Sequence, residues 1–209
     1  MTASTTLRDV IGLPQELPRL GESALIMIDF QNTYRTGVMR LEGAEEAVAA
    51  GARLLAAARA AGAPVVHVVN DGGEGTPYDI RAEIGEISPE VAPAEGEKVV
   101  VKQFPDAFHA TDLADTLKDL GVGVGLGGDL VIAGFMTHMC VLFTAQGAFN
   151  RGYRPTVVAE ATATRPLAAP DGSVLPSDVL RDASLTTVSD LFGTVARTVD
   201  ELVAATPVS

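Results

Sequence analysis

Short apolar runs alternate with amphipathic stretches along most of the chain. A strand that is buried on both faces of a parallel sheet gives a continuous apolar run, whereas a helix that packs on the sheet carries one apolar stripe. The continuous runs predict strands at residues 23–30, 64–70, 98–102, 129–135, 153–159 and 193–196. The amphipathic stretches predict helices at residues 44–61, 111–120, 137–151 and 177–191.

Strands and helices that alternate in this way are typical of an α/β fold, with a mostly parallel sheet and helices on both of its faces. Residues 1–22, which include Pro14 and Pro18, predict an irregular N-terminal arm. Residues 71–97 are rich in Gly, Pro and Glu and only weakly periodic, which indicates a long excursion of loops and short turns. Such excursions often form the walls of binding sites or contacts between subunits.

Composition and charge narrow the class of protein. The chain has 209 residues, of which 47% are hydrophobic and 20% are charged, so we expect one well-filled globular domain. The net charge of -12 argues against nucleic acid as a partner and disfavours an anionic membrane surface. The start of the chain lacks the apolar core of a signal peptide, and no run reaches membrane-spanning length. Because Cys140 is the only cysteine, a disulfide within one subunit is excluded, and we expect a cytoplasmic protein.

Three chemically distinctive residues follow three of the predicted strands. Asp29 lies at the end of the first strand, Lys102 ends the third, and Cys140 follows the fourth at the start of a helix. The carboxyl ends of parallel strands share one edge of the sheet, and ligands bind at that edge. The sequence therefore predicts that these three side chains converge.

Together, the three residues are a complete set for acyl transfer through a thioester. We expect the Lys102 ammonium to help keep Cys140 as a thiolate at neutral pH, and the Asp29 carboxylate to act as base and then as acid. The backbone N–H groups of Met136 and Cys140 are candidates for the oxyanion hole. Taken singly, Asp29 could instead be a turn acid, Lys102 a solvated surface charge, and Cys140 an inert buried thiol.

Three segments carry a specific resemblance to a known family. Residues 25–32, 101–108 and 134–145 resemble, in order and spacing, the signature segments of the isochorismatase-like cysteine hydrolases, which include nicotinamidases and N-carbamoylsarcosine amidohydrolases. The resemblance implies a six-stranded parallel sheet in a hydrolase domain over residues 23–205, with Asp29, Lys102 and Cys140 as the catalytic triad. It also implies a cis peptide bond at Phe135-Met136 and a homo-oligomer, either a dimer or a tetramer.

Two departures from the family pattern narrow the expected activity. The chain has only three histidines, and residues 70–75 offer acids without imidazoles, so we expect no metal site of the nicotinamidase type and no cofactor. Vinyl-ether hydrolases of the family lack the nucleophilic thiol that is present here. We therefore expect a cysteine-dependent hydrolase of a small amide, lactam or related C–N bond. The alternatives are a vinyl-ether hydrolase of the isochorismatase type and a non-catalytic member of the fold.

Residues near the three predicted site residues in the sequence are candidates for contacts with a small-molecule substrate. The aromatic candidates either line an apolar pocket or belong to the packed core. The polar candidates either contact the substrate or stabilise a turn. The substrate-binding candidates are Phe30, Gln31, Tyr34, Phe104, Phe108, Phe135 and His138. His67, inside a buried strand, is predicted to be a core histidine whose polar atoms are satisfied. Arg165, just after the fifth strand, is either a contact to substrate or subunit or an ordinary loop residue.

Overall fold

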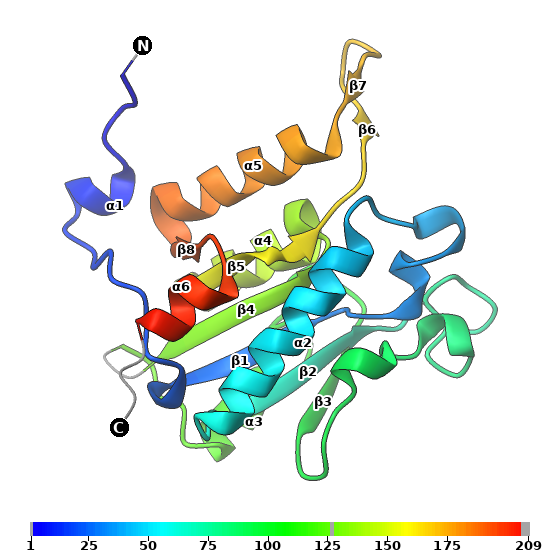
Figure 1. Cartoon of the computed structure of the whole chain (residues 1–209), viewed down its shortest axis with the longest axis horizontal. Coiled ribbons are helices and arrows are strands. Elements are labelled where there is room, and N and C mark those ends of the chain that lie inside the picture. Colours follow the sequence, from blue (N-terminus) through cyan, green and yellow to red (C-terminus); the bar gives the residue numbers. More distant parts are fainter. Residues whose placement is uncertain (1, 126–127, 206–209) are drawn as a thin grey trace.

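The fold is built on a central sheet of six parallel strands (Figure 1). The computed structural model describes residues 2–125 and 128–205. Within them the strand order is β3-β2-β1-β4-β5-β8, and every neighbouring pair is parallel. The strands are β1 (Ser23–Ile28), β2 (Val65–Asn70), β3 (Lys98–Lys102), β4 (Asp129–Phe135), β5 (Arg154–Ala163) and β8 (Thr194–Ala196). The prediction of a six-stranded parallel α/β fold is confirmed.

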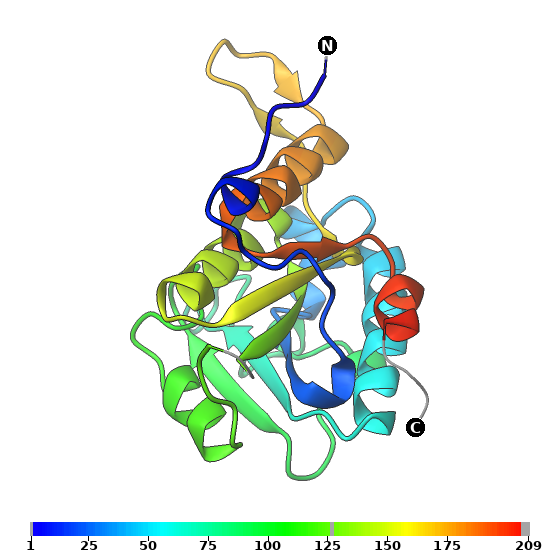
Figure 2. The same ribbon diagram turned by 90° about the vertical axis from the view of Figure 1, so that its left-hand side faces the viewer.

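Helices cover both faces of the sheet, which gives three layers (Figure 2). Side chains of α2 (Ala44–Ala60) and α6 (Val199–Ala204) belong to one buried apolar cluster. Side chains of α3 (Leu113–Asp119), α4 (Leu142–Asn150) and α5 (Ser177–Thr187) belong to the other. The strands alternate between the two clusters, since Leu25 and Met27 join the first and Ala24 and Ile26 the second. Each strand is therefore covered on both sides, as its continuous apolar run predicts.

Several short elements were not predicted individually from the apolar pattern, and two of them lie inside the helices predicted at 137–151 and 177–191. The N-terminal arm contains a one-turn helix, α1 (Leu7–Val10), and the segment after β5 forms a hairpin of β6 (Leu167–Ala168) and β7 (Val174–Leu175). Single helical turns are η1 (Leu20–Glu22), η2 (Asn32–Tyr34), η3 (Gly37–Met39), η4 (Glu83–Gly85), η5 (Pro89–Val91), η6 (Thr137–Val141) and η7 (Val188–Phe192). Elements of two to five residues carry too few positions for a periodic signal.

The fifth strand extends beyond its predicted end at residue 159. An irregularity in the pairing of β4 with β5 separates the Ile132–Val157 pair from the Gly134–Thr162 pair. Beyond it β5 continues to Ala163, which pairs with Phe135. The residues after β5 are thereby carried to the same edge of the sheet as the segment that contains Cys140.

A close approach of helix α2 to the segment after β1 depends on a glycine. A Cβ atom at Gly51 would lie 2.7 Å from Cζ of Phe30. Glycine inside a helix costs about 1 kcal/mol relative to alanine. Here it makes room for the Phe30 ring, which lies beside the candidate site.

None of the helices in the described part of the chain is long and apolar enough to cross a lipid bilayer.

Candidate active site

Asp29, Lys102 and Cys140 form one contiguous buried cluster. The Nζ atom of Lys102 lies 2.7 Å from Oδ2 of Asp29 and 3.2 Å from Sγ of Cys140. Exposed fractions are 0% for Asp29, 1% for Lys102 and 6% for Cys140. The sequence-based prediction that the three side chains converge is thus met by the geometry, and only the cysteine retains some contact with solvent.

The end of β1 is bent sharply to aim the Asp29 carboxylate. Asp29 has a φ of 52°, a left-handed conformation that Asp tolerates better than most residues, and its N–H donates to Val68 O at 2.8 Å. Gln31 holds the turn in place, because its Nε2 donates to Gly85 O at 2.8 Å and its Oε1 accepts from Asn70 N at 2.9 Å. The Gln31 amide is therefore committed to backbone groups.

The turn that carries Cys140 begins at Gly134, the partner of Ile28 in the β1–β4 pairing. Gly134 has a φ of 133°, and a Cβ atom there would lie 1.8 Å from Ile28 O, so only glycine fits. The peptide bond Phe135-Met136 that follows is cis, as the family resemblance implies. The N–H groups of Met139 and Val141 then donate to Met136 O, at 3.0 and 3.2 Å, and close the turn around Cys140.

Burial and mutual charge shift the pKa values of all three groups. Burial raises the pKa of Asp29, and the neighbouring Lys102 ammonium opposes this only in part. For Lys102, burial lowers the pKa, but Asp29 and Cys140 outweigh it and the net pKa is raised. Burial and the Asp29 carboxylate raise the pKa of the Cys140 thiol to about 12, although Lys102 acts in the opposite direction. Burial and the neighbouring Asp29 carboxylate thus favour the thiol form of Cys140, whereas Lys102 favours the thiolate that the sequence predicts.

An aromatic cluster lies beside the buried residues. The Phe135 ring is 5.0 Å from the Phe30 ring and 5.5 Å from the Tyr34 ring, measured between centroids. Tyr34 also contacts Tyr78, at 5.8 Å. Burial raises the pKa of Tyr34, and electrostatic interactions with Asp29 and Cys140 raise it further. Tyr78 comes from the loop excursion at 71–97, where the sequence offered only the general signal of a long loop.

The other substrate-binding candidates lie in different surroundings. Phe104 is 47% exposed and packs edge-on against His109, while Phe108 stacks on Tyr153 in the apolar cluster on the opposite face from Phe30, Tyr34 and Phe135. Half-buried His138 bonds through Nδ1 to Thr164 Oγ1 at 2.5 Å. The structure therefore groups Phe30, Tyr34 and Phe135 on one face of the sheet, places Phe108 in the apolar cluster that also contains Cys140, and leaves Phe104 at the surface.

The two remaining predictions concern histidine and metal. His67 is buried, and its Nε2 lies 2.8 Å from Glu97 Oε2, which confirms a satisfied core histidine. In the 70–75 segment the Asp71 carboxylate is bound by the guanidinium of Arg81, with N–O distances of 2.8 and 2.9 Å. Over residues 2–125 and 128–205, no three or more His, Cys, Asp or Glu side chains are arranged to hold a metal ion.

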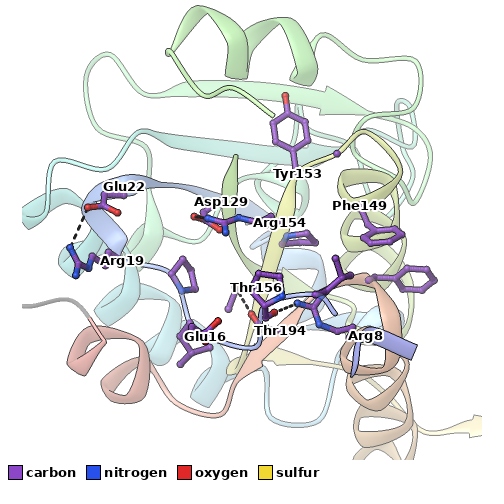
Figure 3. Close-up of a pocket in the computed structure, with 17 residues that line it drawn as sticks. Arg8, Glu16, Arg19, Glu22, Asp129, Phe149, Tyr153, Arg154, Thr156 and Thr194 are labelled. Atoms are coloured by element: carbon purple, nitrogen blue, oxygen red, sulfur yellow. Dashed lines mark hydrogen bonds and ion pairs between the residues drawn. The ribbon is translucent and has the colours of Figure 1, made fainter. Parts of the chain in front are cut away.

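A pocket of about 410 Å³ lies at the amino edge of the sheet, away from this cluster (Figure 3). Its lining includes Asp129, Arg154 and Thr194, which are the first residues of β4, β5 and β8, together with Arg8 from the N-terminal arm. Asp29, Lys102 and Cys140 lie at the opposite, carboxyl edge. We therefore place the candidate active site at the buried cluster and not at this pocket.

The protein has a parallel three-layer α/β fold, and a thiol, an ammonium and a carboxylate are buried together at the carboxyl edge of its sheet. This combination of fold and site is that of an enzyme. The comparison with known families makes the assignment definite. Residues 23–200 match the isochorismatase domain, so the chain belongs to the isochorismatase family and is a hydrolase of that family.

The similar proteins span between about two thirds and nearly all of the chain. A crystal structure of an isochorismatase from Pseudomonas putida KT2440 is 38% identical, with a TM-score of 0.89, and the match covers 96% of this chain and 100% of that one. The secreted isochorismatase effector Isc1 of Verticillium dahliae is 31% identical over 94% of this chain and 98% of that protein. A maleamate amidohydrolase of Pseudomonas putida is 34% identical over 68% of this chain and 72% of that protein.

Proposed function

We propose that the protein is a cysteine amidohydrolase that cleaves the C–N bond of a small amide, lactam or related compound through a thioester. The observation that carries the proposal is the buried contact of Lys102 Nζ with both Asp29 Oδ2, at 2.7 Å, and Cys140 Sγ, at 3.2 Å. A nucleophile, a base and a fixed cation within reach of one another are the parts that acyl transfer requires.

In the first half of the reaction, Cys140 attacks the carbonyl carbon of the amide. Because burial and the Asp29 carboxylate favour the thiol form of Cys140, its proton passes to the Asp29 carboxylate as the C–S bond forms. The raised pKa of Asp29 makes it a stronger base than an ordinary carboxylate. Lys102 stabilises the sulfur as it becomes negative, and the N–H groups of Met136 and Cys140 bind the oxyanion. Asp29 then gives its proton to the leaving nitrogen as the C–N bond breaks.

In the second half, water hydrolyses the thioester. Asp29, again a carboxylate, takes a proton from the water as its oxygen attacks the carbonyl carbon. The C–S bond breaks, the proton passes from Asp29 to sulfur, and the free acid leaves. The cycle returns the thiol, the carboxylate and the ammonium to their starting states and needs no cofactor.

Two further features support amide chemistry. A relative that is 34% identical is named a maleamate amidohydrolase, an enzyme of C–N hydrolysis. Phe30, Tyr34 and Phe135 are buried in the apolar core beside the cluster, where they would form the apolar floor of a site for a small, partly apolar substrate. We further propose that the enzyme works in the cytoplasm as a homo-oligomer, with a small-molecule substrate and neither nucleic acid nor membrane as partner.

Replacement of Cys140 distinguishes this proposal from its alternatives. In a panel of small amides, lactams and ureas, we expect Cys140→Ala to lower kcat at least about 1,000-fold, because no nucleophile remains. Mass spectrometry of the wild-type protein during turnover should show an acyl adduct on Cys140. Lys102→Gln should lower kcat by about 100-fold, whereas Lys98→Gln, an exposed lysine on the same strand, should change it less than about twofold.

Other outcomes would support the competing functions. A vinyl-ether hydrolase would need Asp29 to protonate carbon and would keep its activity in Cys140→Ala. A non-catalytic member of the fold would turn over no substrate in the panel and would form no adduct. Either result would contradict the amidohydrolase proposal.

A further inference from the structure

The pocket at the amino edge of the sheet has the size and the lining of a ligand site. Its volume, about 410 Å³, lies within the range of pockets that hold small molecules. Residues of the N-terminal arm form one wall, and the first residues of β4, β5 and β8 form another (Figure 3). The apolar part of the lining includes Leu13, Leu17, Phe149, Pro155 and Phe192. A small organic molecule would therefore meet both apolar and polar groups here.

Arg8 brings a buried positive charge to this pocket. It is only 7% exposed and is the one buried arginine of the described chain. Its guanidinium donates to two uncharged groups, Leu191 O at 3.3 Å and Pro14 O, and its Nε has no hydrogen-bond partner. Over residues 2–125 and 128–205, no carboxylate forms an ion pair with Arg8. Because an unpaired buried charge is costly, an anion in the pocket would stabilise this guanidinium.

The acidic side chains of the lining leave the charge of Arg8 uncompensated. Two of them are paired with other arginines, as Asp129–Arg154 and Glu22–Arg19. The third, Glu16, is exposed and forms no ion pair with the described residues. Burial lowers the pKa of Arg8, and the charge of Asp9 opposes this only in part. The buried side of the pocket therefore favours a negatively charged ligand.

Two buried hydroxyl groups line the same pocket. Thr156 and Thr194 are 2% and 9% exposed, and their Oγ1 atoms are 2.7 Å apart. One hydroxyl donates to the other, and the remaining hydroxyl hydrogen has no acceptor among the described residues. In Figure 3 the Arg8 side chain extends toward both threonines. The unused donors favour a ligand with acceptor oxygens.

We propose that this pocket binds a small monocarboxylate with an apolar body, whose carboxylate contacts Arg8 and the Thr156–Thr194 hydroxyls. A guanidinium offers two parallel N–H donors to a carboxylate. One negative charge compensates Arg8, and the net charge of -12 opposes more highly charged anions. The rings of Phe149 and Phe192, with centroids 5.9 Å apart, would contact an aromatic body.

This ligand would connect the N-terminal arm to the sheet. Arg8 belongs to the arm, whereas Thr156 and Thr194 belong to β5 and β8. Because the site exists only in the folded protein, binding stabilises the folded state. The candidate active site lies at the opposite edge of the sheet, so the ligand should leave kcat/KM within about twofold of its value without ligand. The site does not depend on the proposed reaction.

The test compares acids with alcohols of the same skeleton. The probes are benzoate, phenylacetate and cinnamate, each paired with benzyl, phenethyl or cinnamyl alcohol. For at least one acid, calorimetry should give a dissociation constant of about 1 mM or lower, at least about tenfold below that of its alcohol. At ten times the dissociation constant, that acid should raise the melting temperature by about 3 °C.

Three variants locate the binding in the pocket. Arg8→Gln removes the charge but keeps an N–H donor, and it should weaken binding of the acid at least about tenfold and abolish its advantage over the alcohol. Thr194→Val keeps the shape of the side chain without its hydroxyl and should weaken binding about three- to tenfold. Arg19→Gln is the matched control, since Arg19 lines the same pocket but is exposed and paired with Glu22. It should change the affinity less than about twofold.

A crystal structure with para-bromobenzoate shows where the ligand lies, through the anomalous signal of bromine. Bromine in this pocket, with the carboxylate on Arg8, would support the proposal even if Arg8→Gln does not fold. Bromine only beside Cys140, equal affinities for acid and alcohol, or equal affinities in wild type and folded Arg8→Gln would overturn it. A dimer that Arg8→Gln dissociates, as measured by light scattering, would show that a second subunit supplies the anion and would also overturn it.

Discussion

The residue-scale chemistry turns on which atom holds the proton in the resting enzyme. A lysine next to a cysteine favours a thiolate, but the buried Asp29 carboxylate beside Cys140 favours the thiol. We therefore propose that in the resting state the charges of the cluster are those of Asp29 and Lys102, which are 2.7 Å apart. In the proposed mechanism, the sulfur is therefore activated only as the substrate is attacked.

This charge distribution predicts the pH dependence of alkylation at Cys140. The thiolate is the reactive form, and its fraction rises as the pH rises through the thiol pKa. Because that pKa is raised to about 12, the rate constant for iodoacetamide should still be rising at about pH 10. Asp29→Asn removes a charge that raises the pKa, so its alkylation profile should shift to lower pH. The measurement is mass-spectrometric quantification of the adduct over a pH series.

The same substitution should have the opposite effect on turnover. Without a base and acid at position 29, we expect kcat to fall by about 100- to 10,000-fold even though the sulfur is more reactive toward iodoacetamide. Lys102→Gln is the matched comparison, because it removes the charge that lowers the Cys140 pKa and should move alkylation to higher pH. An Asp29→Asn profile that coincides with the wild type would contradict the proposed charge distribution.

At the scale of secondary structure, the sequence specified the strands well because a buried parallel strand leaves a direct signal. Strands β3 and β4 begin and end at the predicted residues, 98–102 and 129–135. Because the strands all run in the same direction, the residues that follow them lie at one edge of the sheet. The helix predicted at 137–151 consists of two consecutive elements, the π-helical turn η6 and the α-helix α4. The pattern of hydrophobic residues does not distinguish a π-helical turn from an α-helix.

Contacts that depend on side-chain direction were beyond the sequence. Phe104 follows β3 by two residues, yet it points to solvent, because the pleat and the following turn decide its direction. Tyr78 reaches the site from an aperiodic loop, so no pattern locates it. The burial of Arg165 Nε without a hydrogen-bond partner is visible only once the positions of its neighbours are known.

Gly134 is the element-scale position with the sharpest prediction. Gly134→Ala would place a methyl group 1.8 Å from Ile28 O and impose a φ of 133° on a residue with a Cβ. We expect the β1–β4 pairing to open next to Cys140, with a loss of about 3 kcal/mol or more in the free energy of unfolding and a large loss of activity. Urea titration followed by circular dichroism measures the first effect.

The control for Gly134→Ala is Gly123→Ala. Gly123 is exposed, and no atom of the described residues lies within 4 Å of the position its Cβ would take. Its stability should change by less than about 0.5 kcal/mol. Equal stabilities for the two variants would mean that β1 and β4 do not approach as closely as the structure indicates.

At the scale of the whole molecule, the N-terminal arm and the candidate active site lie at opposite edges of the sheet. The candidate active site lies at the carboxyl edge, while the N-terminal arm packs against the amino edge (Figures 1 and 3). Arg8 anchors the arm, since it is only 7% exposed and its guanidinium donates to Leu191 O, at 3.3 Å, and to Pro14 O. The arm is therefore expected to contribute to folding without touching the reaction.

Arg8→Ala tests this separation. The substitution leaves the carbonyl groups of Leu191 and Pro14 without their donor, so we expect a loss of about 1–3 kcal/mol in the free energy of unfolding. Because distant sites act almost independently, kcat/KM at 25 °C should stay within about twofold of wild type. Arg19→Ala is the control, since Arg19 and its partner Glu22 are 56% and 70% exposed and such a pair contributes less than about 1 kcal/mol. Denaturant titration and steady-state kinetics on the same samples give both quantities, and a fall in kcat/KM of the folded Arg8→Ala protein would mean that the arm is coupled to the active site across the sheet.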